Sequence, residues 1–167
     1  MKNLLLAATL VLTFLTQPVT ADTFNLPSED PTVSVEIPKA WNPEELEQGV
    51  AGESPDQVVT ILFEATDEKG VDKLIDENVD WLVDEQKLQI DPKSKATKEF
   101  EVGDRTWSRV SWDADSKDWG ASVVGFLFTD IGNGNRLTVT YWVTKKDNEK
   151  HWGTIEEMLT SVTPLEE

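Results

Sequence analysis

The stretch that most constrains the fold is residues 121–144, ASVVGFLFTDIGNGNRLTVTYWVT, in which two runs of β-branched and aromatic residues flank a short turn. In each run the side chains alternate with a period of two, which places neighbours on opposite faces of a strand. Neither set is charged, so we expect both faces to be covered, as in a central strand. Gly132, Asn133 and Gly134 can supply the positive φ angles of a hairpin loop. The stretch therefore predicts a β-hairpin in the middle of an antiparallel sheet.

The rest of the chain supplies further strands and two helices. Residues 71–85 place apolar side chains on one helical stripe and acidic side chains outside it. A last helix is predicted to start near Asp147 or Asn148 and to stop before Pro164. One helical turn is predicted at residues 44–47. Strands are predicted at residues 32–38, 49–53, 57–65, 97–102 and 106–113. The fold class is α+β, with a central antiparallel sheet of six or seven strands.

The chain opens with MKNLLLAATLVLTFLTQPVTA, a lysine followed by a short apolar run and small residues. This pattern predicts a signal peptide over residues 1–21, cleaved between Ala21 and Asp22. The run is shorter than the roughly 20 apolar residues that a membrane span needs, so a retained anchor is the less favoured alternative. We expect a flexible leader over 22–31, a single domain over 32–167, and a periplasmic or secreted protein without membrane insertion after cleavage.

The formal net charge is −17, and the chain has no cysteine. Such an excess of acidic residues repels nucleic acid and anionic lipid surfaces and favours cationic partners or divalent ions. A solvated surface would have the same composition, because the acids are spread along the whole chain. The missing cysteines exclude disulfides, cysteine-based zinc sites and thiol catalysis.

No residue pattern indicates a catalytic site or a cofactor. His151 is the only histidine, and the chain contains neither the G-x-S-x-G of serine hydrolases nor a phosphate-binding glycine loop. Asp113, Asp115 and Asp118 are weak metal candidates in a polar connection, and their spacing fails the EF-hand pattern. Two alternatives to a binding module stay open: a hydrolase that cleaves envelope glycans with an acidic pair, and a soluble protein that binds divalent cations.

Seven tryptophans are unusual in a chain of 167 residues. Tryptophan is enriched at the energetic centres of protein interfaces. We expect most of them to fill the layers between sheet and helices, with Trp107 and Trp119 as candidates for an exposed interface.

Four short segments carry a resemblance to a known family. They are an alternating strand closed by proline and tryptophan, a helical segment, a late strand and the chain's last helix: Val35–Trp41, Asn78–Leu82, Leu137–Trp142 and Met158–Val162. Together with the order of elements, they resemble the PsbP-like superfamily, which includes DcrB-type periplasmic proteins and a nuclear Ran-binding protein. The resemblance implies an antiparallel sheet sandwiched between helices, in proteins that mostly bind partners and do not catalyse. We therefore expect a non-catalytic exported module with an acidic surface that binds an unidentified envelope protein.

Overall fold

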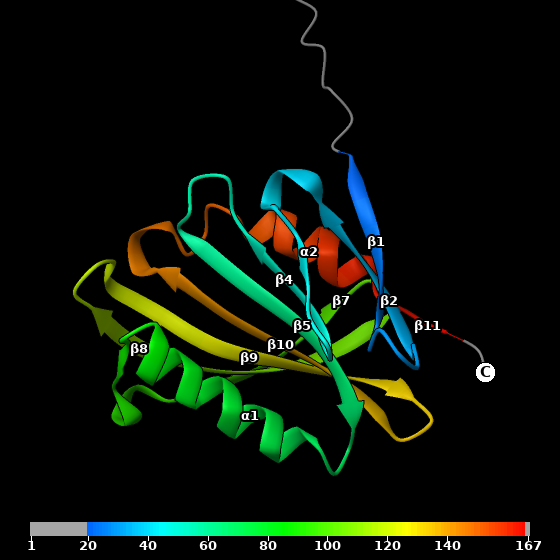
Figure 1. Ribbon diagram of the computed structural model, residues 1–167. Helices are drawn as coiled ribbons and strands as arrows, with labels where there is room; N and C mark the ends of the chain where they lie inside the picture. Colours follow the sequence, from blue (N-terminus) through cyan, green and yellow to red (C-terminus); the bar gives the residue numbers. More distant parts are fainter. Residues whose placement is uncertain (1–19, 166–167) are drawn as a thin grey trace, which may run out of the picture.

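The centre of the molecule is a twisted antiparallel sheet, seen in a computed structural model that describes residues 20–165 (Figure 1). Strand β10 lies in its middle, between β5 and β9. Strand β7 pairs with β8 beside the short β6, so within the described residues this sheet has eight strands, more than the six or seven predicted. In sheet order the strands are β3 (Glu44–Glu45), β4 (Gly49–Glu53), β5 (Val59–Asp67), β10 (Asn135–Thr144), β9 (Gly120–Gly132), β8 (Arg105–Ser116), β6 (Gln89–Ile90) and β7 (Ala96–Val102).

The predicted central hairpin is confirmed in β9 and β10. The loop uses positive φ angles at Gly132, Asn133 and Gly134. A further glycine matters within the strand: a Cβ atom on Gly125 would lie 2.8 Å from the ring of Tyr141 on β10. The hairpin therefore depends on a close approach of ring and backbone as well as on its turn.

A second, three-stranded sheet contains the segment that was expected to be a flexible leader. Strand β1 (Ala21–Leu26) pairs along its whole length with β2 (Val33–Pro38), and β11 (Thr163–Pro164) pairs with the other edge of β2. Leu26 is buried, with 2% of its surface exposed. The expectation of a flexible leader was wrong because the segment forms a strand on β2. The two alternating apolar side chains Phe24 and Leu26 are enough to hold this strand in place when a partner strand is present. The signal peptide lies almost wholly outside the described residues, so the cleavage site stays a prediction.

Two helices lie on the large sheet. Helix α1 (Val71–Asp80) continues as a π-helical segment, η2 (Trp81–Glu85), as the apolar stripe predicted. Helix α2 (Trp152–Ser161) begins later than predicted. The carboxylate of Asp147 accepts a hydrogen bond from the hydroxyl of Thr144 and does not cap a helix; a 3-10 turn, η4 (Lys145–Asp147), stands there instead. The helical turn predicted at 44–47 is also wrong, because β3 pairs with β4. Two other 3-10 turns are η1 (Lys39–Trp41) and η3 (Pro92–Ser94).

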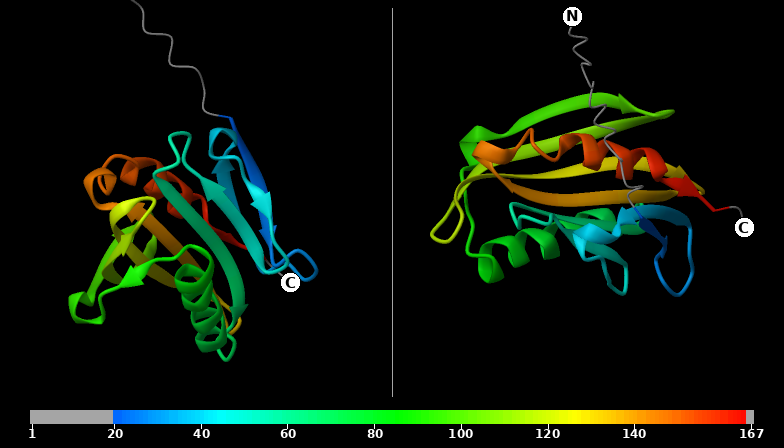
Figure 2. Two further views of the ribbon diagram at one scale, coloured as in Figure 1. Left: turned by 60° about the vertical axis from the view of Figure 1, so that its left-hand side comes forward. Right: turned by 90° about the horizontal axis from the view of Figure 1, so that it is seen from above.

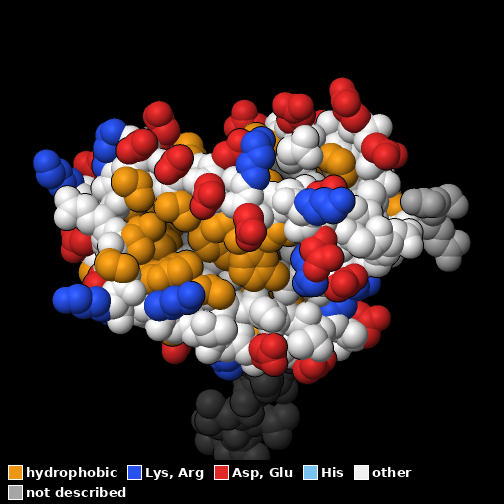
Figure 3. Space-filling view, turned by 90° about the horizontal axis from the view of Figure 1, so that it is seen from below, with side chains coloured by type: hydrophobic (Ala, Val, Ile, Leu, Met, Phe, Trp, Pro, Cys, Tyr) orange, Lys and Arg blue, Asp and Glu red, His pale blue; other side chains and the backbone are white. Residues whose placement is uncertain are grey.

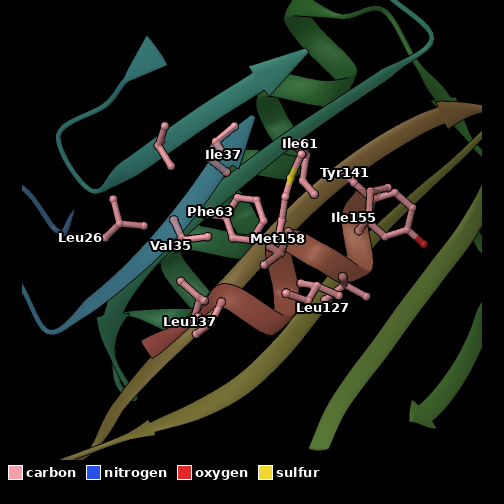
Figure 4. Close-up of a cluster of buried hydrophobic side chains, with 14 of the residues drawn as sticks. Leu26, Val35, Ile37, Ile61, Phe63, Leu127, Leu137, Tyr141, Ile155 and Met158 are labelled. Carbon is pink, nitrogen blue, oxygen red and sulfur yellow. The ribbon is translucent and has the colours of Figure 1, made fainter. Parts of the chain in front are cut away.

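The two faces of the large sheet are covered differently. One face packs against α2 and the small sheet, in a core that includes Phe63, Leu137 and Met158, each at most 1% exposed (Figure 4). The other face carries α1 (Figure 2). Side chains of this helix belong to one apolar cluster with Leu62 and Trp142 of the sheet. The expected cover of helices is thus present only in part, since the small sheet shares one face with α2 and α1 covers only part of the other.

Candidate functional site

Of the two tryptophans predicted at an interface, only Trp119 is exposed. It lies in the turn between β8 and β9 with 41% of its surface exposed. Trp107 is completely buried in the core on the α2 side, so its proposed role at a surface was wrong. The sequence could not place it, because an alternating strand does not say which of its two faces points inward.

The three candidate metal ligands do not form a site. Within residues 20–165 no group of three His, Cys, Asp or Glu side chains lies close enough to hold a metal ion. Asp113 and Asp115 belong to β8, which extends to Ser116, and not to the polar connection expected there. The carboxylate of Asp113 instead forms an ion pair of 2.9 Å with Lys145.

His151 belongs to a small polar cluster that links the β4–β5 turn to the start of α2. Its Nε2 lies 2.9 Å from the Asp56 carboxylate, and its ring meets the edge of Trp41 at 5.7 Å. A hydrogen bond from Lys150 holds the pKa of Asp56 far below its usual range. Ser54 donates its hydroxyl proton to the same carboxylate at 2.8 Å and does not face the histidine. This geometry joins two segments and does not assemble a Ser-His-Asp triad, where the serine must face the histidine.

A pocket of about 670 Å³ lies between α1 with η2 and the strands β3, β4 and β5. Its walls are largely apolar and include Leu46, Leu62, Trp81 and Trp142. The two indole rings meet edge to face, with centroids 5.1 Å apart. Pockets of a few hundred cubic ångströms with apolar walls and a few polar groups are typical of small-molecule sites.

The buried carboxyl group among the residues that line this pocket is that of Glu64, on β5. Only 8% of its surface is exposed, and Asn78 of α1 donates a hydrogen bond of 2.6 Å to its Oε2. The same amide group donates to Thr140 Oγ1 at 2.9 Å. Burial raises the pKa of Glu64, and the charge of Glu77 adds to this, while the hydrogen bond from Asn78 opposes it. A buried carboxyl with a raised pKa in a pocket is a common property of functional sites.

Sequence reasoning did not single out this pair, although both residues left a signal. Glu64 is the one charged residue in the apolar run of β5, and Asn78 interrupts the apolar stripe of α1 between Leu74 and Leu82. Both interruptions lie on the faces that pack together. Two polar residues that interrupt apolar faces of neighbouring elements can be read as hydrogen-bonding partners, because buried polar groups need them.

The same face of the sheet carries a broad apolar surface on the far side of α1. Figure 3 shows hydrophobic side chains gathered there, with acidic side chains along one border. Val83 is 42% exposed, and the other side chains are half-buried. We call this surface the apolar band; it consists of Ile75, Val79, Val83, Ile90, Trp112 and Phe128. At one end, a cavity of about 370 Å³ lies between Ile75, Phe128 and the ion pair of Arg136 with Glu68.

Comparison with known proteins identifies the fold. The sequence matches no model of a known protein family and no curated protein sequence. The structure matches that of cyanobacterial PsbP (CyanoP) from Synechocystis sp. PCC 6803 with a TM-score of 0.55 and 6% identity, over 91% of this chain and 96% of that one. It also matches LpqN of Mycobacterium tuberculosis, described as involved in cell envelope biogenesis, with a TM-score of 0.50 and 11% identity, over 87% and 92% of the two chains.

These matches confirm the resemblance inferred from the sequence: the chain has a PsbP-like fold. Neither description names a catalytic activity. Within residues 20–165, neither α1 nor α2 has the length and apolar character that crossing a bilayer requires.

Proposed function

We propose that the chain is a non-catalytic, exported module that binds a protein of the cell envelope through the apolar band. The observation that carries this proposal is the partial cover of one sheet face. Side chains of α1, β6, β8 and β9 meet there, and no second helix of residues 20–165 lies over them. Contiguous apolar surface on a small protein marks an interaction site, and aromatic side chains such as Trp112 and Phe128 are the kind that contribute most at interfaces.

The negative charge beside the apolar band indicates what kind of partner surface would fit it. Next to the band, the outer side of α1 carries Asp72, Asp76 and Asp80, all exposed, in a chain of net charge −17. A complementary partner presents an apolar segment flanked by lysine or arginine, which the acidic border would attract and orient. Nucleic acid and anionic lipid are repelled by the same charge.

The site of action follows from the predicted signal peptide and agrees with the fold comparison. An apolar leader before a small-residue cleavage site directs export. One structural neighbour is described as involved in cell envelope biogenesis. Both support a protein that acts in the periplasm or outside the cell.

The pocket makes a glycan hydrolase the rival hypothesis, since it contains the buried Glu64 together with Glu44 and Glu53. The strand register argues against it. The residues directly beside Glu64 are Gly49 and Thr138, neither of them acidic. Glu44 is paired with Ala51 and Glu53 with Thr60, so neither stands at a register position next to Glu64, whereas the two carboxyl groups of a glycosidase flank one scissile bond. The arrangement favours binding over hydrolysis.

The proposal can be tested by site-specific photo-cross-linking in the native host. A photoreactive residue at Val83 lies in the apolar band, and one at Glu157 lies exposed on α2 as the matched control. We expect one envelope protein to be cross-linked from Val83 and not from Glu157, less at high salt and less after Phe128→Ser. Mass spectrometry of the product should map an apolar segment with basic flanks. Equal products from both positions, or a partner segment without those features, would refute the proposal.

A further inference from the structure

The pocket on the other side of α1 has a chemistry of its own, distinct from the apolar band. Trp81 projects to this side of the helix, and its ring meets Trp142 on β10. The lining includes three carboxylates, Glu44, Glu53 and Glu64, and among the described lining residues there is no lysine, arginine or histidine. A site of this kind combines aromatic surface with negative charge and contains no cation of its own.

The carboxyl group of Glu64 is the part of the pocket that can take up a further interaction. The residue is more than nine-tenths buried, and one carboxyl oxygen, Oε2, is held by Asn78. The other oxygen, Oε1, accepts no hydrogen bond within the described part of the chain and keeps accessible surface in the pocket that Glu64 lines. A carboxylate in a pocket with largely apolar walls attracts positive charge more strongly than one in bulk water, so a ligand that brings positive charge to it would be stabilised.

We propose that this pocket binds an organic ammonium ion: a small cation with apolar substituents, its charge against Glu64 and its apolar part against Trp81 and Trp142. Aromatic side chains attract such cations through the negative face of the ring, and quaternary ammonium groups are the ligands most often held in this way. A carboxylate within the same pocket adds a charge-assisted contact that a neutral ligand of the same shape does not gain. The pocket's volume of about 670 Å³ admits a ligand considerably larger than a trimethylammonium group.

The charge of Glu64 makes binding depend on pH. Burial raises the pKa of this carboxyl, so protonation competes with the cation. The other carboxylates near the pocket are Glu44 of β3 and Glu53 of β4, which line it, and Glu77 of α1, whose charge raises the same pKa; each favours a cation in the ionised form. Affinity for the cation should rise with pH until Glu64 is ionised and then stay constant.

The test compares choline with its neutral carbon isostere, 3,3-dimethyl-1-butanol, against the full exported chain. NMR titration follows the indole N–H signals of Trp81 and Trp142, which the ligand would contact. We expect saturable shifts of these two signals with choline, and binding of the neutral isostere weaker by about tenfold or more. No saturable shift, or equal affinity for the two compounds, would overturn the proposal.

Matched variants distinguish the effect of the Glu64 carboxyl group from the effect of the protein's overall negative charge. Glu64→Gln keeps the shape and an acceptor for Asn78, and should weaken choline binding by about tenfold or more and abolish its dependence on pH. Glu157→Gln removes the same charge from an exposed site on α2 and should leave binding unchanged. Trp81→Phe should weaken binding while the fold, checked by the remaining indole signals, stays intact. Unchanged binding in Glu64→Gln, or an equal loss in Glu157→Gln, would exclude Glu64 as the cation's partner.

Discussion

The two faces of the large sheet both carry apolar side chains, but they differ in how completely these side chains are covered. On the α2 face, helix and small sheet together leave side chains such as Phe63, Leu127 and Leu137 without exposed surface. On the α1 face, Trp81, Trp112 and Phe128 belong to the apolar cluster yet remain half-exposed. The α1 face thus combines fully buried side chains, such as Leu82 and Val124, with partly exposed apolar ones that are available for recognition. Both the apolar band and the pocket of Glu64 lie on that second face.

The sharpest way to test this division is a pair of phenylalanine truncations. Phe63→Ala on the covered face should lower the free energy of unfolding by about 3–5 kcal/mol, because it leaves a cavity in a closed core. Phe128→Ala on the other face should cost about 1–1.5 kcal/mol, since its ring is already partly exposed to water. Urea denaturation measures both, and equal losses would show that the faces do not differ in this way.

A second test concerns the close contact inside the central hairpin. Gly125→Ala should destabilise the protein by about 1–3 kcal/mol, because its Cβ would lie 2.8 Å from the Tyr141 ring. Gly153→Ala is the control: nothing lies within 4 Å of its Cβ, and in a helix the change should stabilise by about 1 kcal/mol. Thermal unfolding of both variants compares the two outcomes. A neutral effect of Gly125→Ala would mean that the tyrosine ring can move aside.

A third test uses Glu64, which lies on the α1 face and makes the free energy of unfolding depend on pH. Its folded-state pKa is raised, so its contribution to stability is fully present below the pKa of the unfolded chain and is lost as pH rises through the folded-state value. Glu64→Gln removes this loss, and the variant should be more stable than the wild type at neutral and alkaline pH, with the difference disappearing in acid. Urea denaturation over a range of pH measures it. A pH-independent difference would contradict the assignment.

The smallest effect on stability is expected at Val83. Replacement by serine at this exposed site should change the free energy of unfolding by no more than about 0.5 kcal/mol. The same change should reduce partner binding through the apolar band, as measured by the yield of cross-linked complex from a photoreactive residue at Val79. A stable variant with undiminished cross-linking would remove Val83 from the interface.

Local patterns predicted much of this fold and little of its site. The uncharged alternation of β10 identified a central strand, and β4 was predicted at its observed bounds, Gly49–Glu53. Strand β1 was missed because its order depends on β2, which follows it in the chain. Packing of β8 in the sheet decides that Trp107 points inward, and packing of α1 on β5 brings Asn78 to Glu64. Periodicity within one element cannot predict how two elements pack.

The ends of the large sheet have a consequence for how this protein can be recognised. One end is β3, two residues long and both glutamate, and the β7 end includes Lys98, Glu99 and Glu101, all exposed. The β3 edge is too short to offer an incoming extended peptide much backbone, and the charged side chains at both edges oppose fibre-like stacking of copies. A partner that docks by extending the sheet is thereby disfavoured, and contact is directed to side chains on the broad surface around α1.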